Sequence, residues 1–163
     1  MATQQYDVKS IHLQATNANA IPFRTRLKSV IISPSTAVTG QATFYDLTSV
    51  AATYTRATTT VTVTYAAHGL FTNQWVYLDF TSGGALDGVY QVTVTGADTF
   101  TVTTVASGTI TTNNVTAYLN VLAMADATNA TSFNVLIPGE GVLARTGIGV
   151  VLPSNTTCTI FYG

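Results

Sequence analysis

Residues 58–65 read Thr-Thr-Thr-Val-Thr-Val-Thr-Tyr, and from Thr60 onward each threonine is followed by an apolar residue. A period of two is typical of a strand that turns one face to a core and the other to solvent. Similar short runs recur along the chain, bounded by Gly, Pro, Asn and Ser. They cover residues 8–13, 26–33, 41–46, 74–80, 89–95, 99–105, 115–124, 132–137, 148–152 and 156–162. The sequence therefore predicts an all-β fold of antiparallel strands.

The middle of the chain differs from its two ends. Strands expected within 56–114 are dominated by threonine, whereas those in 1–55 and 115–163 are richer in apolar residues. This contrast favours a jelly-roll-like antiparallel β-sandwich formed by 1–55 and 115–163, with 56–114 inserted as a small β-barrel or hairpin lobe. The alternative is one continuous sandwich of roughly ten or eleven strands. Local propensity does not decide between them, because both need pairing between distant segments.

The composition excludes several classes of protein. Charged residues make up 8% of the 163 positions and hydrophobic residues 47%, so we expect a folded chain rather than a disordered one. The formal net charge is -1, with six Lys and Arg in total, which argues against a nucleic-acid partner. No apolar run is long enough to span a membrane, and we expect no signal peptide. The single Cys158 cannot form an internal disulfide and suits a strand.

Residues that could support catalysis are sparse. The chain has two histidines, His12 and His68, and no two of its carboxylates lie closer than eight residues apart. We expect His12 on the outward face of a strand and His68 at a turn bonding backbone groups. Asp87 and Asp98 are expected to stabilise turns by bonding the backbone two residues on. The sequence therefore predicts no enzyme, no cofactor and no metal site.

Candidate contact residues fall into two groups. Trp75, Tyr77 and Tyr90 crowd the inserted segment, where most aromatic side chains belong in a core but an exposed pair would stack on sugar rings or fill a partner's pocket. The second group is the basic cluster Arg24, Arg26 and Lys28. The polar segments Thr3–Asp7 and Gln14–Ala20 are interpreted either as an arm that docks on a neighbouring subunit or as a loose terminus.

Two parts of the sequence resemble structural proteins of tailed bacteriophages. The runs 61–78, with His68-Gly69-Leu70, and 86–102, with Asp87-Gly88-Val89-Tyr90 and Asp98-Thr99-Phe100-Thr101, look like a β module found in several virion proteins. Asn73-Gln74 stands where that pattern has Gly-Asp, and Asp87 where it has Asn. The outer segments are similar to small sandwich proteins of marine and cyanobacterial podophages. Those segments are 27–34, 40–46, 137–150 and 156–163.

This resemblance implies a virion protein, assembled in the cytoplasm of a bacterial host. We expect it to decorate or cement the exterior of the phage capsid, through contacts with the major capsid protein and with itself as a dimer or trimer. One alternative is a tail fibre, knob or adaptor protein that contacts host-surface glycan. A second alternative is a carbohydrate-binding or adhesion module. The resemblance supplies no catalytic or binding residues that could be assigned to positions of this chain.

Overall fold

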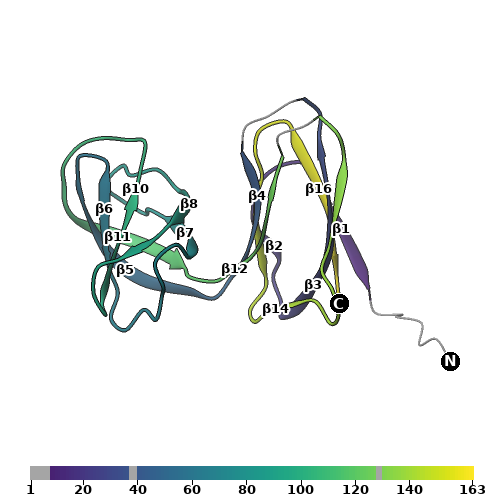
Figure 1. Cartoon of the computed structure of the whole chain (residues 1–163), viewed down its shortest axis with the longest axis horizontal. Coiled ribbons are helices and arrows are strands. Elements are labelled where there is room, and N and C mark those ends of the chain that lie inside the picture. Colours follow the sequence, from purple (N-terminus) through teal and green to yellow (C-terminus); the bar gives the residue numbers. More distant parts are fainter. Residues whose placement is uncertain (1–7, 37–39, 128–129) are drawn as a thin grey trace. The chain divides into compact units, whose positions relative to one another are not determined.

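The computed structural model describes residues 8–36, 40–127 and 130–163. Within them every regular element is a strand, and the strand pairs are antiparallel. The chain divides into two compact units, Met1–Leu47 with Leu122–Gly163 and Thr48–Val121 (Figure 1). We call them the sandwich and the lobe. No helix that could span a membrane occurs in the part of the chain that the structure describes.

The sandwich consists of two sheets. The first sheet has the order β1-β16-β3-β13, with β14 also paired to β3, and the second has the order β12-β4-β15-β2. The strands of the sandwich are β1 (Lys9–Leu13), β2 (Asn17–Ile21), β3 (Thr25–Pro34), β4 (Gln41–Asp46), β12 (Val121–Asp126), β13 (Phe133–Leu136), β14 (Val142–Ala144), β15 (Ile148–Val151) and β16 (Thr156–Tyr162).

The connectivity of the sandwich is that of a jelly roll. The chain passes back and forth between the two sheets from β1 to β4, and again from β12 to β16. Treating β13 and β14 as one position gives eight positions in two four-stranded sheets, which is the jelly-roll arrangement. The lobe is inserted between β4 and β12, which are neighbours in the second sheet. The predicted all-β sandwich with an inserted barrel lobe is therefore confirmed.

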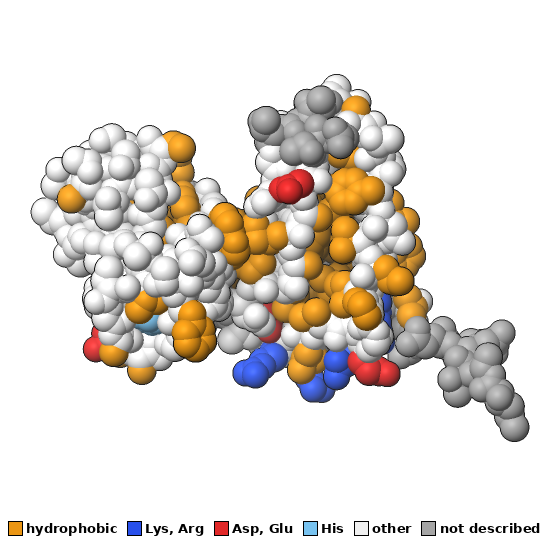
Figure 2. Space-filling view, viewed as in Figure 1, with side chains coloured by type: hydrophobic (Ala, Val, Ile, Leu, Met, Phe, Trp, Pro, Cys, Tyr) orange, Lys and Arg blue, Asp and Glu red, His pale blue; other side chains and the backbone are white. Residues whose placement is uncertain are grey.

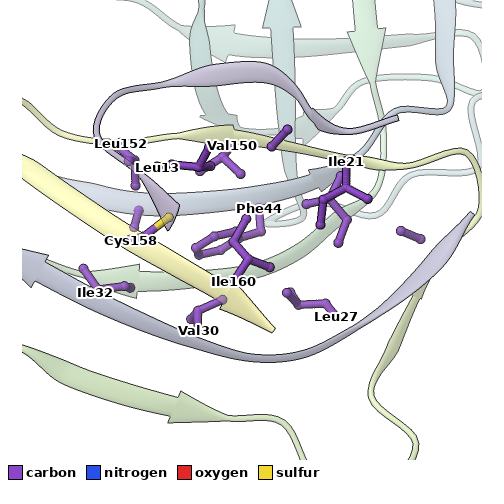
Figure 3. Packing of buried hydrophobic residues seen from close by; sticks show 14 of the residues in the cluster. Leu13, Ile21, Leu27, Val30, Ile32, Phe44, Val150, Leu152, Cys158 and Ile160 are labelled. Atoms are coloured by element: carbon purple, nitrogen blue, oxygen red, sulfur yellow. The ribbon is translucent and has the colours of Figure 1, made fainter. Parts of the chain in front are cut away.

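Apolar side chains from both sheets fill the space between them (Figure 3). Phe44 on β4 is fully buried and lies near Ile160 of the opposite sheet. Alternation explains this packing for strands such as β16, one face of which supplies the core, whereas β4 is buried along nearly its whole length. Further members of this core are Leu13, Ile21, Leu27, Val30, Ile32, Val150, Leu152 and Cys158.

Cys158 provides a probe of sandwich folding. Its side chain is 1% exposed, and burial raises the pKa of the thiol from 9.0 to about 11. We expect no reaction with iodoacetamide at pH 8 in the folded protein and full reaction in concentrated urea, because the thiolate is the nucleophile. The raised pKa stabilises the fold below pH 9, and this contribution is lost as the pH rises toward 11. Rapid labelling without urea would contradict the assigned burial.

The lobe is a single, nearly closed barrel-like sheet of order β8-β7-β11-β5-β6-β10-β9. Its strands are β5 (Ser49–Ala57), β6 (Thr60–Thr64), β7 (Trp75–Asp79), β8 (Gly88–Gln91), β9 (Thr93–Val94), β10 (Thr99–Thr103) and β11 (Ile110–Tyr118). The two edge strands, β8 and β9, follow one another in the chain. Val92 between them donates its N–H to Gln74 O at 2.9 Å and accepts from Asn73 N–H at 2.8 Å.

Threonine covers the outer surface of the lobe. Val61, Val63 and Phe100 point inward and are fully buried. The alternate positions carry threonines that pair across strands, such as Thr62 with Thr55 and with Thr101. Twenty of the 32 threonines lie within 48–121. Threonine has a high strand propensity and carries no charge, so this surface is strand-forming and nearly neutral.

The structure places the unit boundaries at 47/48 and 121/122, whereas the sequence suggested 55/56 and 114/115. The difference lies in two strands. Residues 47–55 lie outside the strand runs expected from the sequence, yet most of them belong to β5, which pairs with β11 from Ser49↔Tyr118 onward. The run 115–124 was expected to be one strand, but it is divided between the end of β11 and the start of β12 at 119–120.

The structure describes all of Gln14–Ala20, and this segment is not a free arm. Asn17–Ile21 forms β2, an edge strand of the second sheet that pairs with β15. Thr16 reinforces the attachment, because its hydroxyl donates to Leu152 O at 3.2 Å and accepts from Leu152 N–H at 2.9 Å. The arm hypothesis is wrong for these residues, because Ala20 and Ile21 are buried in the core. Thr3–Asp7 lies outside the described residues.

Candidate functional site

A hollow of about 380 Å³ lies on the outward face of the first sheet. Residues from β3, β13 and β16 form it, together with Val8 just before β1 and the loop that follows β13. It is lined by Val8, Lys28, Ser29, Ile31, Asn134, Leu136, Ile137, Gly139 and Phe161. We call this hollow the groove. Leu136 is 74% exposed at its wall, and Val8 is 38% exposed. These apolar side chains stand on a rigid sheet, which suits contact with another protein.

The basic cluster mainly holds the loop beside the groove. Arg26 Nη1 donates to Gly141 O at 3.2 Å, and Lys28 Nζ lies 3.8 Å from a carboxylate oxygen of Glu140. Lys28 O also accepts from Ile137 N–H at 3.1 Å. Arg24 is exposed in the turn between β2 and β3. Figure 2 shows Lys and Arg side chains gathered beside acidic ones at this end of the sandwich. Of the three predicted basic residues, Arg26 and Lys28 therefore contact the 139–141 loop of their own chain.

The three predicted aromatic residues do not share one face. Trp75 and Tyr77 alternate with the buried Val76 on β7 and point outward, as the sequence suggested. Trp75 is 36% exposed. Tyr90 lies opposite Val76 across the β7–β8 pair and packs against the lobe core. Its hydroxyl donates to Leu86 O at 2.5 Å, and its ring meets that of Phe80. Sequence alone did not reveal the register that separates Tyr90 from Trp75.

Carboxylates surround the phenols of the lobe. Burial, followed by the charges of Asp87 and Asp79, raises the pKa of Tyr77 to about 12. Burial and Asp87 likewise raise the pKa of Tyr90. The pKa of Asp79 is raised by burial and then by Asp87. The phenols therefore stay protonated at neutral pH, and the Tyr90 hydroxyl donates to Leu86 O. Tyr77 also stacks obliquely on Tyr118, with ring centroids 5.6 Å apart.

His68 is a buried structural residue, as the sequence suggested. Its Nε2 lies 3.0 Å from Gly96 O and 3.3 Å from Thr99 O, and Nδ1 accepts from Leu70 N–H at 3.0 Å. Two carbonyl acceptors at Nε2 assign the proton to that nitrogen. The imidazole therefore joins the 66–70 turn to the 96–99 turn. A second hollow of about 400 Å³ opens beside it, lined by Ala67, His68, Gly69, Leu70, Val94, Gly96 and Ala97.

The two turn carboxylates bond backbone N–H groups that are further away in the sequence than expected. Asp98 Oδ1 accepts from Ala67 N–H at 2.7 Å, and Asp87 Oδ1 accepts from Phe80 N–H at 2.7 Å. Each therefore stabilises another segment rather than the backbone two residues on. His12, in contrast, lies on the outward face of β1 as predicted, where its Nδ1 is 3.0 Å from Thr159 Oγ1. None of these groups is arranged as a nucleophile with a base.

Arg56 is the one cationic side chain within 48–121. It is 8% exposed and points into the lobe, where Nε donates to Gly108 O at 3.3 Å. Among the described residues Nη1 has no hydrogen-bond partner. A Cβ on Gly108 would stand 3.0 Å from Nη2, so glycine at this position leaves room for the guanidinium. A buried charge with incomplete pairing costs stability.

Across the ranges that the structure describes, no group of three or more His, Cys, Asp and Glu side chains could hold a metal ion. The features that stand out are instead surfaces, namely the groove and the outward aromatic side chains of the lobe. Sequence reasoning missed the groove because its lining residues come from both ends of the chain. Comparison of the chain with protein-family models and with curated proteins finds no match.

Proposed function

We propose that this protein is a structural component of a phage virion that decorates or cements the outside of the capsid. The observation that carries the proposal is the eight-position jelly roll with a lobe inserted between β4 and β12. Jelly rolls occur in viral capsid proteins, lectin domains and cupins, so the fold alone leaves the partner open. The resemblance of 61–78 and 86–102 to phage virion modules favours the first of these.

The surface chemistry supports attachment to protein. The groove presents Ile31, Leu136 and Phe161 on a sheet whose opposite face is a packed core. Apolar side chains on a rigid support lose little conformational entropy when a partner covers them. A capsid shell repeats its binding sites, so many copies with modest individual affinity attach firmly.

Copy number tests the capsid assignment. Protein from purified virions is separated, and the amount of this chain is compared with that of the major capsid protein by quantitative mass spectrometry. A decoration protein is expected in a fixed, high ratio to the capsid protein, because every lattice position binds it. A few copies per particle would instead indicate a tail component, and absence from virions would overturn the proposal.

The tail alternative rests on exposed aromatic residues in the lobe. Phe71 is 78% exposed and Trp75 is 36% exposed. Exposed aromatic rings stack on sugar rings, so we expect a tail protein to bind host polysaccharide through Trp75. A glycan array probed with the wild-type chain and with Trp75→Ala tests this alternative, with Val105→Ala as the matched control. Trp75-dependent binding would favour the tail assignment, and no binding would remove its support.

A further inference from the structure

Arg56 is the only charged side chain buried in the lobe, all of which the structure describes. It points inward from β5, two residues after the buried Tyr54. Its neighbours across the sheet are Val61 of β6 and Ile110 of β11, both apolar. The guanidinium is therefore held at the end of an apolar core, where a charge is poorly solvated.

Most hydrogen-bond donors of this guanidinium are unused. Its one hydrogen bond within the described chain runs from Nε to Gly108 O, at 3.3 Å. Nη1 is buried and has no partner there. Most guanidinium N–H groups belong to the two Nη atoms, which form a planar fork that fits two oxygens of one anionic group. With this fork unpaired, Arg56 can bind an oxyanion.

The lobe supplies no counter-charge for Arg56. Within residues 48–121 the carboxylates are Asp79, Asp87 and Asp98. Asp79 lies level with Ala51, five residues before Arg56 on β5, which is roughly 16 Å away along the strand. Within this range, which the structure describes throughout, no ion pair joins Arg56 to any of the three. Burying a charge without a partner is costly, so an anion from outside the chain would stabilise it.

The loop of residues 104–109 lies beside the guanidinium and carries further donors. Thr104 N–H and Gly108 N–H donate to carbonyls of residues 58–59, at 2.8 Å and 3.0 Å, and so tie the loop to the turn between β5 and β6. Gly108 stands close to the guanidinium, since a Cβ there would lie 3.0 Å from Nη2. The N–H groups of residues 105–107 donate to no group of the described chain. Free backbone N–H groups next to a guanidinium suit a small anion.

We propose that Arg56 and the 104–109 loop form a binding site for a small oxyanion, either inorganic phosphate or a carboxylate group. The anion accepts hydrogen bonds from Nη1 and Nη2 and supplies the counter-charge that the lobe lacks. A bulky polyanion does not fit this site, because Arg56 is only 8% exposed. Since Nη1 is closed to solvent, the anion enters by a movement of the loop. This inference is independent of where in a virion the protein acts.

Nitrogen-15 NMR of the full chain tests the site directly. The arginines are Arg24, Arg26, Arg56 and Arg145, and the Nε–H signal of Arg56 is assigned through its bonds to the Arg56 backbone. Titration with phosphate at constant ionic strength is expected to shift this signal with saturation, at a Kd of about 1 mM or lower. Acetate is the second probe. Saturation by phosphate alone identifies inorganic phosphate as the ligand, and saturation by acetate identifies a carboxylate. Saturation by neither would overturn the proposal.

Urea unfolding gives a second readout. Phosphate at ten times its Kd is expected to raise the folding equilibrium constant of the lobe about eleven-fold, seen as a higher midpoint of Trp75 fluorescence. General stabilisation by phosphate also raises the Cys158 labelling midpoint of the sandwich, so the difference between the two midpoints measures specific binding. Arg56→Met removes the charge from an apolar site, so we expect it to fold and to lose this difference. The exposed Arg24→Met is the matched control. An unchanged difference in Arg56→Met would contradict the site.

Discussion

Replacing Asp46 with asparagine is expected to lower the free energy of unfolding of the sandwich by about 3 kcal/mol. Asp46 ends β4 and is fully buried. One carboxylate oxygen accepts from Arg145 N–H at 2.7 Å, and the other accepts from Thr146 N–H at 3.2 Å and from the Thr146 hydroxyl at 2.9 Å. An amide group in this place turns a donor toward backbone donors and leaves at least one of them unpaired. The loss is large because the Asp46 side chain is fully buried and both of its oxygens are used as acceptors.

Labelling of Cys158 as a function of urea measures this loss in the sandwich, since it is the only cysteine of the chain. The labelling midpoint of Asp46→Asn is expected at clearly lower urea than that of the wild type. Asp126→Asn is the control. Asp126 is exposed and accepts from Gln41 Nε2 at 2.8 Å, so its loss is expected to stay within about 0.5 kcal/mol. Equal midpoints for the two variants would refute the role given to Asp46.

Truncation of Phe100 to alanine is expected to destabilise the lobe by about 3–5 kcal/mol. Phe100 on β10 is fully buried, and its ring meets the His68 imidazole edge-on at a centroid distance of 5.4 Å. Removing the ring leaves a cavity that does not readily close, because β10 is held by pairing on both sides, with β6 and with β9. Phe100→Leu keeps most of the volume, and we expect it to cost clearly less.

Tryptophan fluorescence follows lobe unfolding, since Trp75 on β7 is the only tryptophan. The fluorescence midpoint in urea is expected to fall for Phe100→Ala, while the Cys158 labelling midpoint moves less. This difference is expected because the two units have separate apolar cores. A fluorescence midpoint equal to that of the wild type would contradict the packing assigned to Phe100.

Strict alternation was the reliable signal for the fold. The run 58–65 contains β6, and 156–162 coincides with β16, because both place one apolar face on a core. β2 was not predicted because Asn17–Ile21 is a largely exposed edge strand with only Ala20 and Ile21 buried. β5 was obscured by small residues and by the inward-pointing Arg56, which breaks the expected pattern of apolar residues inside.

The candidate surfaces were harder to predict than the strands. Alternation placed Trp75 and Tyr77 on one face correctly, but only the β7–β8 register shows that Tyr90 points the other way. The groove depends on β1, β16, β3 and β13 lying side by side, although they come from both ends of the chain. Local patterns carry no information on such pairing between distant segments. Lys28 was predicted as a contact residue without its Glu140 partner for the same reason.

The assignment to the outside of a phage capsid is tested most directly by electron microscopy of virions labelled with an antibody against this chain. The virions are prepared from a phage whose genome contains the coding sequence of this chain, and the secondary antibody carries gold. Label spread over the head surface is the result that the proposal predicts. Label confined to the tail would contradict it and make the lobe, with Trp75 outward, the candidate receptor-binding part. Particles without label, from which the chain is also absent by mass spectrometry, would exclude a virion role.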